Sequence, residues 1–264
     1  MPLRTTSLEP LPIDAVLPRI IESLRARRSL VLRAPTGAGK TTRVAPALLD
    51  SGVTEGSVIL VEPRRLAARA AAGRIAFERG QNLGGEVGYR VRFDHKTSAA
   101  TRLVAMTEGL LVRRLQDDPF LEGVGAVLFD EFHERNLDAD LGLAMVRMIQ
   151  SDLRAELAIV VMSATLETAP LASYLGDCPV IESQGRLYPV AIEHRGPERE
   201  TRLEVSVVRG VRDVLGKSDG DVLVFLPGVG EIRRCATVLE SLARAADIEV
   251  VELYGDLAAD RQDA

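Results

Sequence analysis

The strongest constraint on the fold is a series of short, continuous apolar runs. None of them alternates between apolar and polar residues as a half-exposed strand does. Continuous runs of this length are typical of parallel strands that are covered on both faces. The runs, each four to six residues long, lie at 29–32, 57–61, 102–106, 126–129 and 157–162.

The segments between these runs have the spacing of helices. Residues 64–80 are rich in alanine and end at Gly80, a typical helix stop. Alternating strands and helices predict an α/β fold, a parallel sheet with helices on both faces. Within residues 136–150, most of the apolar side chains fall on one helical stripe, namely Leu137, Leu141, Ala144, Val146 and Met148.

The composition is that of a globular protein with a substantial core. Of the 264 residues, 46% are hydrophobic and 27% are charged. No apolar run reaches the roughly 18 residues of a membrane span, and the N-terminus lacks the apolar segment of a signal peptide. We therefore expect a cytoplasmic protein with no membrane partner, in which Cys178 and Cys235 are buried, reduced thiols. The net charge of −5 argues against a protein that coats nucleic acid by bulk electrostatics.

A glycine-rich stretch, RAPTGAGKTT at residues 33–42, lies between the first apolar run and a helical segment. It fits the phosphate-binding pattern G-x-x-x-x-G-K-[ST], with Ala34 in place of the first glycine. A glycine-rich turn can match this pattern by chance, but the strand before it and the helix after it favour an anion-binding loop. Lys40 would then reach the β- and γ-phosphates, and Thr41 would bind Mg²⁺. The predicted nucleotide-binding residues of the loop are Pro35, Thr36, Gly37, Ala38, Gly39, Lys40, Thr41 and Thr42.

An acidic motif, DEFH at residues 130–133, follows the apolar run at 126–129. A carboxylate in this place is where P-loop NTPases hold Mg²⁺, a role that falls to Asp130 together with Thr41. Glu131 is placed to orient or deprotonate the attacking water. An acidic loop after a strand is common, but here it follows a phosphate-binding loop in the expected order. The candidate catalytic residues are Lys40, Asp130, Glu131 and His133, and His133 is not expected to bind a metal.

These and further motifs resemble, in their order, those of superfamily 2 helicases. DEFH resembles the DExH box, with Phe132 where DEAH proteins have alanine. The form DEFHER, together with FLPGVGEI, most resembles the bacterial HrpB-type branch of the DExH/DEAH helicases. The other matches are EPRRLAARAAAGRIA at 62–76 (motif Ia), TEG at 107–109 (motif Ib), SAT at 163–165 (motif III) and VLVFLPGVGEI at 222–232 (motif IV).

The resemblance implies a RecA-like P-loop fold, ATP or another NTP as substrate, Mg²⁺ as cofactor and single-stranded RNA as partner. It leaves open whether DNA is also accepted. Ser163 and Thr165 would couple the nucleotide site to domain closure, whereas a role for Arg90 and Arg92 stays undecided. Arginine forks and loop N–H groups suit phosphate oxygens without reading sequence. The residues that would hold the RNA backbone are Pro63, Arg64, Arg65, Thr107, Glu108 and Gly109.

The base of the nucleotide is expected to be read weakly. No glutamine precedes Lys40, so the glutamine that reads adenine in DEAD-box relatives is absent. DEAH-type relatives stack the base on an arginine of the helix after motif Ia, and the matching residue here is Arg74. We therefore expect loose discrimination among ATP, GTP, CTP and UTP.

Two domains are expected, with the boundary near residue 184 in a segment rich in proline and glycine. Residues 1–184 would form the first RecA-like domain, and 185–264 the start of an incomplete second one. In the second we expect helices at 201–216 and 229–246 and strands at 222–226 and 248–253. Motifs V and VI of the family are not found, and an arginine finger of motif VI can contribute roughly 10³ to 10⁵ in rate. The chain is therefore expected to bind nucleotide and to hydrolyse it poorly.

Two other functions stay open. A transporter ATPase, kinase or GTPase would also use a P-loop, but the chain has neither an LSGGQ nor an NKxD motif, and DEFH followed by SAT is foreign to those families. A non-catalytic, nucleotide-gated RNA-binding module would need the binding residues without the arginine fingers. RNA-stimulated release of phosphate would separate this module from an enzyme. The sequence makes no prediction of oligomeric state.

Overall fold

The computed structural model describes residues 9–165, 168–185, 190–194, 196, 202–217, 220–255 and 257. The chain divides into two compact units, residues 1–188 and residues 189–264. No helix in the described ranges is both long and apolar enough to cross a membrane. Cys178 in the first unit and Cys235 in the second are buried and free, as expected.

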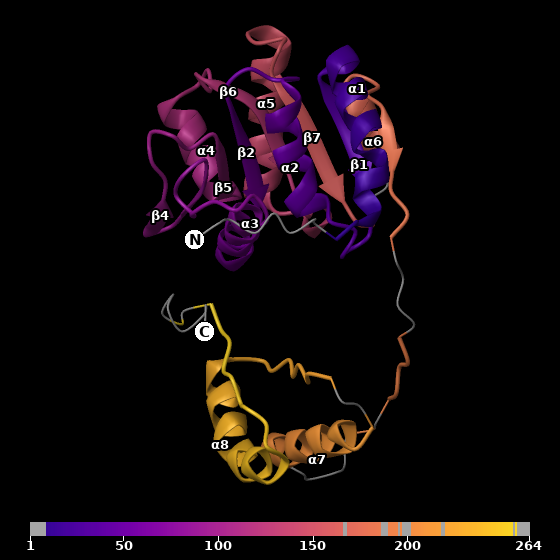
Figure 1. Ribbon diagram of the computed structural model, residues 1–264, viewed down its shortest axis with the longest axis vertical. Coiled ribbons are helices and arrows are strands. Elements are labelled where there is room, and N and C mark those ends of the chain that lie inside the picture. Colours follow the sequence, from indigo (N-terminus) through magenta and orange to yellow (C-terminus); the bar gives the residue numbers. More distant parts are fainter. Residues whose placement is uncertain are drawn as a thin grey trace. The chain divides into compact units, whose positions relative to one another are not determined.

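The first unit is built around an eight-stranded sheet in the order β4-β3-β5-β2-β6-β7-β1-β8 (Figure 1). All neighbouring strands pair in parallel except β3 and β4, which form an antiparallel hairpin at one edge. The five expected strands are confirmed as β1, β2, β5, β6 and β7, whereas β3, β4 and β8 come from segments without a long apolar run. The strands are β1 Ser29–Arg33, β2 Ser57–Glu62, β3 Val87–Val91, β4 Asp94–Lys96, β5 Leu103–Thr107, β6 Val124–Phe129, β7 Ala158–Ser163 and β8 Val180–Glu182.

Helices cover both faces of this sheet, so the predicted α/β fold is confirmed. Alternate strand residues point to opposite faces: Leu30 and Leu32 enter one core with α1, α2 and α3, and Val31 enters the other with α4, α5 and α6. Figure 1 shows α2 in front of the strands and α5 behind them. The helices are η1 Pro12–Val16, α1 Leu17–Arg27, α2 Lys40–Ser51, α3 Arg65–Glu78, α4 Glu108–Asp117, η2 Phe132–Glu134, α5 Leu137–Asp152 and α6 Thr168–Tyr174.

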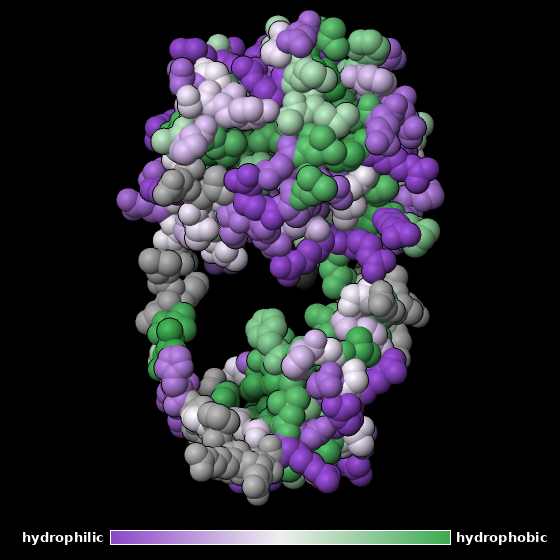
Figure 2. Space-filling model, turned by 180° about the vertical axis from the view of Figure 1, so that it is seen from behind, coloured by the Kyte–Doolittle hydropathy of each residue, from purple (hydrophilic) through white to green (hydrophobic). Residues whose placement is uncertain are grey.

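Of the five residues expected on the apolar stripe of α5, only Val146 is buried in the core. Leu137 is 80% exposed, and Leu141, Ala144 and Met148 are also exposed. Two sets of residues in this helix have helical spacing, and the second set, which shares Val146 with the expected stripe, packs on the sheet. Figure 2, seen from the side of α5, shows hydrophobic side chains gathered on this face. The core-facing residues are Ala139, Leu143, Val146 and Ile149.

The second unit contains the two expected helices, α7 Leu203–Leu215 and α8 Val229–Ala246. The strands expected at 222–226 and 248–253 are wrong, since neither segment is a strand in the structure. An apolar segment becomes a strand only when a neighbour supplies a hydrogen-bonded ladder, and the described part of this unit contains none. The GRLYPV segment at 185–190 lies mostly outside the described residues.

A pair of glycine substitutions tests the loop that leads into β2. Gly56 has φ +95°, and a Cβ there would lie 2.3 Å from the Gly123 carbonyl oxygen. Gly56→Ala should therefore lower the free energy of unfolding by about 1–3 kcal/mol. Gly73→Ala is the control, because Gly73 lies inside α3 with open space around it. This variant should raise the free energy of unfolding by up to about 1 kcal/mol. Urea unfolding measures both, and a Gly56→Ala variant as stable as the parent would contradict this packing.

Candidate functional site

The loops that carry the sequence motifs meet at one edge of the sheet, because parallel strands all end on the same side. From β1 toward β5, the strand order is β1-β7-β6-β2-β5. The loops after these strands carry, in this order, the P-loop, SAT, DEFH, EPRR and TEG. The candidate residues thus come from five adjacent strand ends of a single unit.

The P-loop has the backbone of an anion-binding turn. Gly37 and Gly39 have φ +82° and +93°, a region that glycine adopts without strain. Gly39 precedes the first turn of α2, and a Cβ there would lie 2.6 Å from Leu11 Cδ1. The buried Ala34 donates its N–H to the Ser163 carbonyl oxygen at 3.0 Å. The loop is therefore fixed to β7, with the helix N-terminus of α2 at its end.

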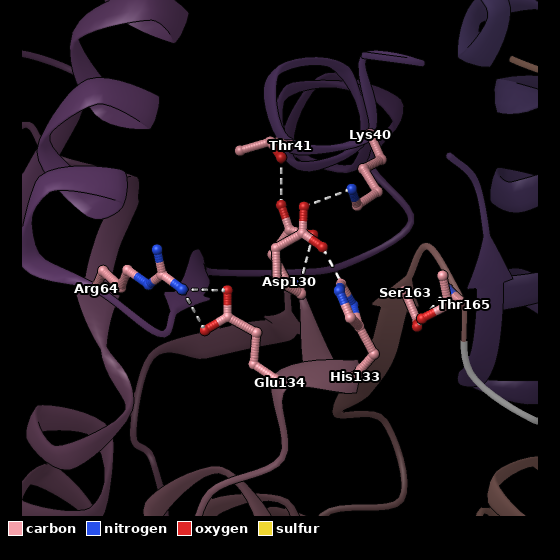
Figure 3. A network of polar contacts seen from close by, with 9 residues as sticks. Lys40, Thr41, Arg64, Asp130, His133, Glu134, Ser163 and Thr165 are labelled. Atoms are coloured by element: carbon pink, nitrogen blue, oxygen red, sulfur yellow. Dashed lines mark hydrogen bonds and ion pairs between the residues drawn. The ribbon is translucent and has the colours of Figure 1, made fainter. Parts of the chain in front are cut away.

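The two predicted halves of the nucleotide site meet directly (Figure 3). Lys40 is only 3% exposed, and its Nζ lies 2.7 Å from Glu131 Oε1. The Thr41 hydroxyl donates a hydrogen bond to Asp130 Oδ2. His133 Nδ1 lies 3.3 Å from the other oxygen of Glu131. Lysine at the start of α2 and the carboxylates after β6 thus form one charged cluster, in which burial raises the pKa of Asp130.

The DEFH segment holds an uncommon backbone. Glu131 has φ +46° and Arg135 has φ +41°, on either side of the short helix η2. Such values in residues other than glycine store strain, and they cluster at functional sites. Phe132 anchors the turn, because its ring is buried and packs edge-on against Phe129 at a centroid distance of 6.1 Å. The turn therefore carries Glu131 on a fixed support.

The predicted nucleic-acid loops lie next to the acidic segment. Arg64 is exposed, and its Nη2 donates to both carboxylate oxygens of Glu134 at 3.1 and 3.2 Å (Figure 3). Glu108 is buried and accepts a hydrogen bond from Asn136 Nδ2. The EPRR and TEG loops adjoin because Glu62 of β2 pairs with Thr107 of β5. Pro63 lies between β2 and α3, Arg65 is the first residue of α3, and Gly109 lies in the first turn of α4.

The two SAT residues lie to one side of the acidic cluster in Figure 3, and Thr165 lines a pocket together with His133. Ser163 is fully buried, and its Oγ accepts the N–H of Thr165 at 3.3 Å. Ser163 pairs with Arg33 of β1, directly before the P-loop. The start of the SAT segment is therefore part of the wall behind the P-loop.

Arg74 lies on α3 and reaches the P-loop helix only through another residue. Its Nε donates to Glu78 Oε1 at 2.7 Å, and Glu78 Oε2 lies 3.6 Å from Arg43 Nε on α2. The Arg74 guanidinium also lies over the exposed ring of Phe77, 5.9 Å from its centroid. The ion pair and the ring contact of Arg74 are thus both with residues of its own helix and not with the P-loop.

Sequence reasoning missed several residues of this edge. Glu62 ends β2 beside Asp130, is 2% exposed, and has an Oε1 without a hydrogen-bond partner. Burial, and after it the charges of Asp130 and Glu131, raise the pKa of Glu62 to about 9. Its signal was a carboxylate at the end of an otherwise apolar run. Glu134 and Asn136 gave no signal, because their partners are distant in sequence.

The fold and the loops at its edge define a RecA-like P-loop domain of the helicase type. Residues 15–172 match the DEAD/DEAH box helicase family, and the chain belongs to that family. The resemblance stated from the motifs is therefore confirmed.

Relatives of known name agree with this assignment. The chain is 42% identical over 252 residues to ATP-dependent RNA helicase HrpB of Escherichia coli K12, covering 96% of this chain and 31% of that protein. It is 34% identical to the human probable ATP-dependent RNA helicase DHX40, covering 95% of this chain and 35% of that protein. A crystal structure of the E. coli DEAH/RHA helicase HrpB matches with a TM-score of 0.85 at 41% identity, over 96% of this chain and 32% of that one. The chain thus spans about a third of the length of these relatives.

Replacing Glu62 tests how much its buried carboxyl destabilises the folded chain as the pH rises. Because its pKa in the folded chain, about 9, lies above its ordinary value of 4.5, the folded state holds a proton that the unfolded state loses. The free energy of unfolding should therefore fall as the pH rises from about 4.5 to about 9. Glu62→Gln stays neutral, so its thermal midpoint should exceed that of the parent by more at pH 8.5 than at pH 5.

The matched control is Glu122→Gln, which changes an exposed carboxylate in the loop before β6. It should leave the pH dependence of the midpoint as in the parent. Equal pH profiles for Glu62→Gln and the parent would contradict the raised pKa.

Proposed function

We propose that this chain is the nucleotide- and RNA-binding part of an ATP-dependent RNA helicase. The observation that carries the proposal is the meeting of Lys40 and Thr41 with Asp130 and Glu131 across the end of β7. Hydrolysis of NTP coupled to movement along single-stranded RNA would be the activity of the whole protein. The names of the relatives, both ATP-dependent RNA helicases, support this reading.

The donor atoms at the site fit Mg²⁺. This ion is bound by one or two protein oxygens, with phosphate oxygens and water completing its shell. Thr41 and Asp130 already converge, as their hydrogen bond requires. Among the described residues, no group of three or more His, Cys, Asp or Glu side chains could form a separate metal cage. When bound, Mg²⁺ would neutralise charge on the phosphates.

The side chains suggest how phosphate would be received. Lys40 is buried and needs a negative partner, and Glu131 supplies it here. A phosphate in the P-loop would take over that partner role and release Glu131. The freed carboxylate could then orient or deprotonate a water, with His133 beside its other oxygen.

RNA would cross the same edge on the side of β2 and β5. Arg64 and Arg65 after β2 and the N-terminus of α4 after Thr107 supply donors for backbone phosphates. The next strand, β3, is followed by a turn that contains the exposed Arg92 and Phe93, with the Arg92 guanidinium 4.7 Å from the centroid of the Phe93 ring. An arginine beside an exposed aromatic ring suits an unpaired base, whatever its identity. We add this hairpin tip to the proposed RNA path.

Lys40→Ala tests the nucleotide site. Lys40 is the only buried lysine among the described residues. Its loss should weaken the binding of a fluorescent Mg²⁺–nucleotide at least about tenfold, or 1.4 kcal/mol. Lys217→Ala, which removes an exposed lysine of the second unit, should bind as the parent does. Equal affinities of the parent and Lys40→Ala would refute the site, and circular dichroism would show whether both proteins are folded.

The choice of base tests the role of Arg74. An arginine that stacks on a base contacts its face, which all four bases share. ATP, GTP, CTP and UTP should therefore compete for the site with affinities within about tenfold of one another. Arg74→Ala should weaken the binding of all four nucleotides by the same factor. A strong preference for ATP would overturn this prediction.

A further inference from the structure

We infer that Glu134 and Asn136 are positioning residues that couple RNA binding to the nucleotide site. The inference rests on the proposed function and concerns how its two sites communicate. Residues 130–136 form one short segment that follows β6. One end of this segment contacts the P-loop helix, and the other end contacts both proposed RNA loops.

The nucleotide end of the segment is held by two contacts. Glu131 Oε1 lies 2.7 Å from Lys40 Nζ, and Asp130 accepts the Thr41 hydroxyl. A nucleotide phosphate would compete for Lys40, because the lysine of a P-loop reaches the phosphates that the loop holds. Nucleotide binding therefore changes the contacts of Glu131.

The RNA end is held by two bridges, one to each RNA loop. Glu134 accepts two hydrogen bonds from Arg64 of the EPRR loop. Asn136 donates to Glu108 of the TEG loop, and its Oδ1 accepts the N–H of Ala139 as the N-cap of α5. An RNA phosphate would compete with Glu134 for Arg64, since both are anions that suit the same guanidinium.

The segment between these ends is suited to transmit a change. It holds one turn of 3₁₀ helix between Glu131 and Arg135, two residues with positive φ. The buried Phe132 anchors the middle of the segment in this structure, and a ligand that changes the contacts of one end would reach the other end through this anchor. The Arg64–Glu134 pair is exposed, with 72% of the arginine side chain accessible. Exposed pairs of this kind contribute little to stability and are readily exchanged.

The expected coupling is positive. RNA that takes Arg64 releases Glu134, which loosens the hold of the segment on the Glu131–Lys40 pair. Phosphate that takes Lys40 relaxes the same segment from its other end. Each ligand then lowers the cost of binding the other, and linkage requires the two effects to be equal.

The experiment is a titration of the whole 264-residue chain with a fluorescent Mg²⁺–nucleotide, with and without saturating single-stranded oligouridylate. In the parent, the oligonucleotide should tighten nucleotide binding about fivefold or more. Glu134→Gln keeps the size of the side chain but weakens its hold on Arg64. Asn136→Asp keeps an N-cap of equal quality but replaces the donor to Glu108 with an acceptor.

Both variants should bind nucleotide alone, and oligouridylate alone, at least as tightly as the parent. The coupling should fall to less than about twofold in each, a loss that simple damage to the fold would not produce with both affinities kept. The control, Glu122→Gln, should keep the coupling of the parent. Equal unfolding midpoints would show that the variants are folded.

Each other outcome overturns a distinct claim. Coupling that persists in both variants overturns the role of Glu134 and Asn136 and leaves the proposed function intact. A parent that binds both ligands independently also overturns the role of Glu134 and Asn136 and leaves the proposed function intact. A parent that binds nucleotide but no oligouridylate refutes RNA binding and the inference with it, and a parent that binds no nucleotide refutes the proposed function itself.

Discussion

Parallel pairing of the central strands decides where the polar candidate residues of this chain can meet. The strands are covered by helices on both faces, so their side chains are almost all apolar and can carry no chemistry. The polar candidate residues lie in the loops or at the carboxyl ends of the strands, and parallel pairing brings the carboxyl ends of β1, β7, β6, β2 and β5 to one edge. Lys40 and Glu131 are 91 residues apart in sequence and meet there at 2.7 Å.

The cluster at that edge is costly by itself, and the cost points to a ligand. Lys40, Glu62 and Asp130 are nearly inaccessible to water, and burial raises the pKa of both carboxyls. Buried charges that lack full compensation destabilise a fold, and titratable groups of this kind concentrate at functional sites. A bound phosphate with its cation would give Lys40 and Asp130 partners of opposite charge.

The sequence alone predicted the elements that depend on a local pattern of residues. Continuous apolar runs predicted the five central strands, and the order of glycines, Lys40 and Thr41 predicted the turn before α2. The sequence did not predict features that depend on packing against other elements of the fold. The α5 helix carries two stripes of helical spacing, and only the sheet decides that Val146 is buried and Leu137 is not. The run at 222–226 has the composition of a strand but no partner in the described part of its unit. The bridges of Glu134 and Asn136 depend on the register of β5, β2 and β6, which no local pattern reveals.

A nucleotide phosphate bound in the P-loop should replace Glu131 as the partner of Lys40. The most direct test is a crystal structure of this chain with Mg²⁺ and a non-hydrolysable ATP analogue. That structure should show a phosphate in the turn formed by Gly37, Gly39 and Lys40, the ion between Thr41 and Asp130, and Glu131 moved away from Lys40. A nucleotide bound elsewhere, or a Lys40–Glu131 pair that stays intact beside a bound phosphate, would contradict this expectation.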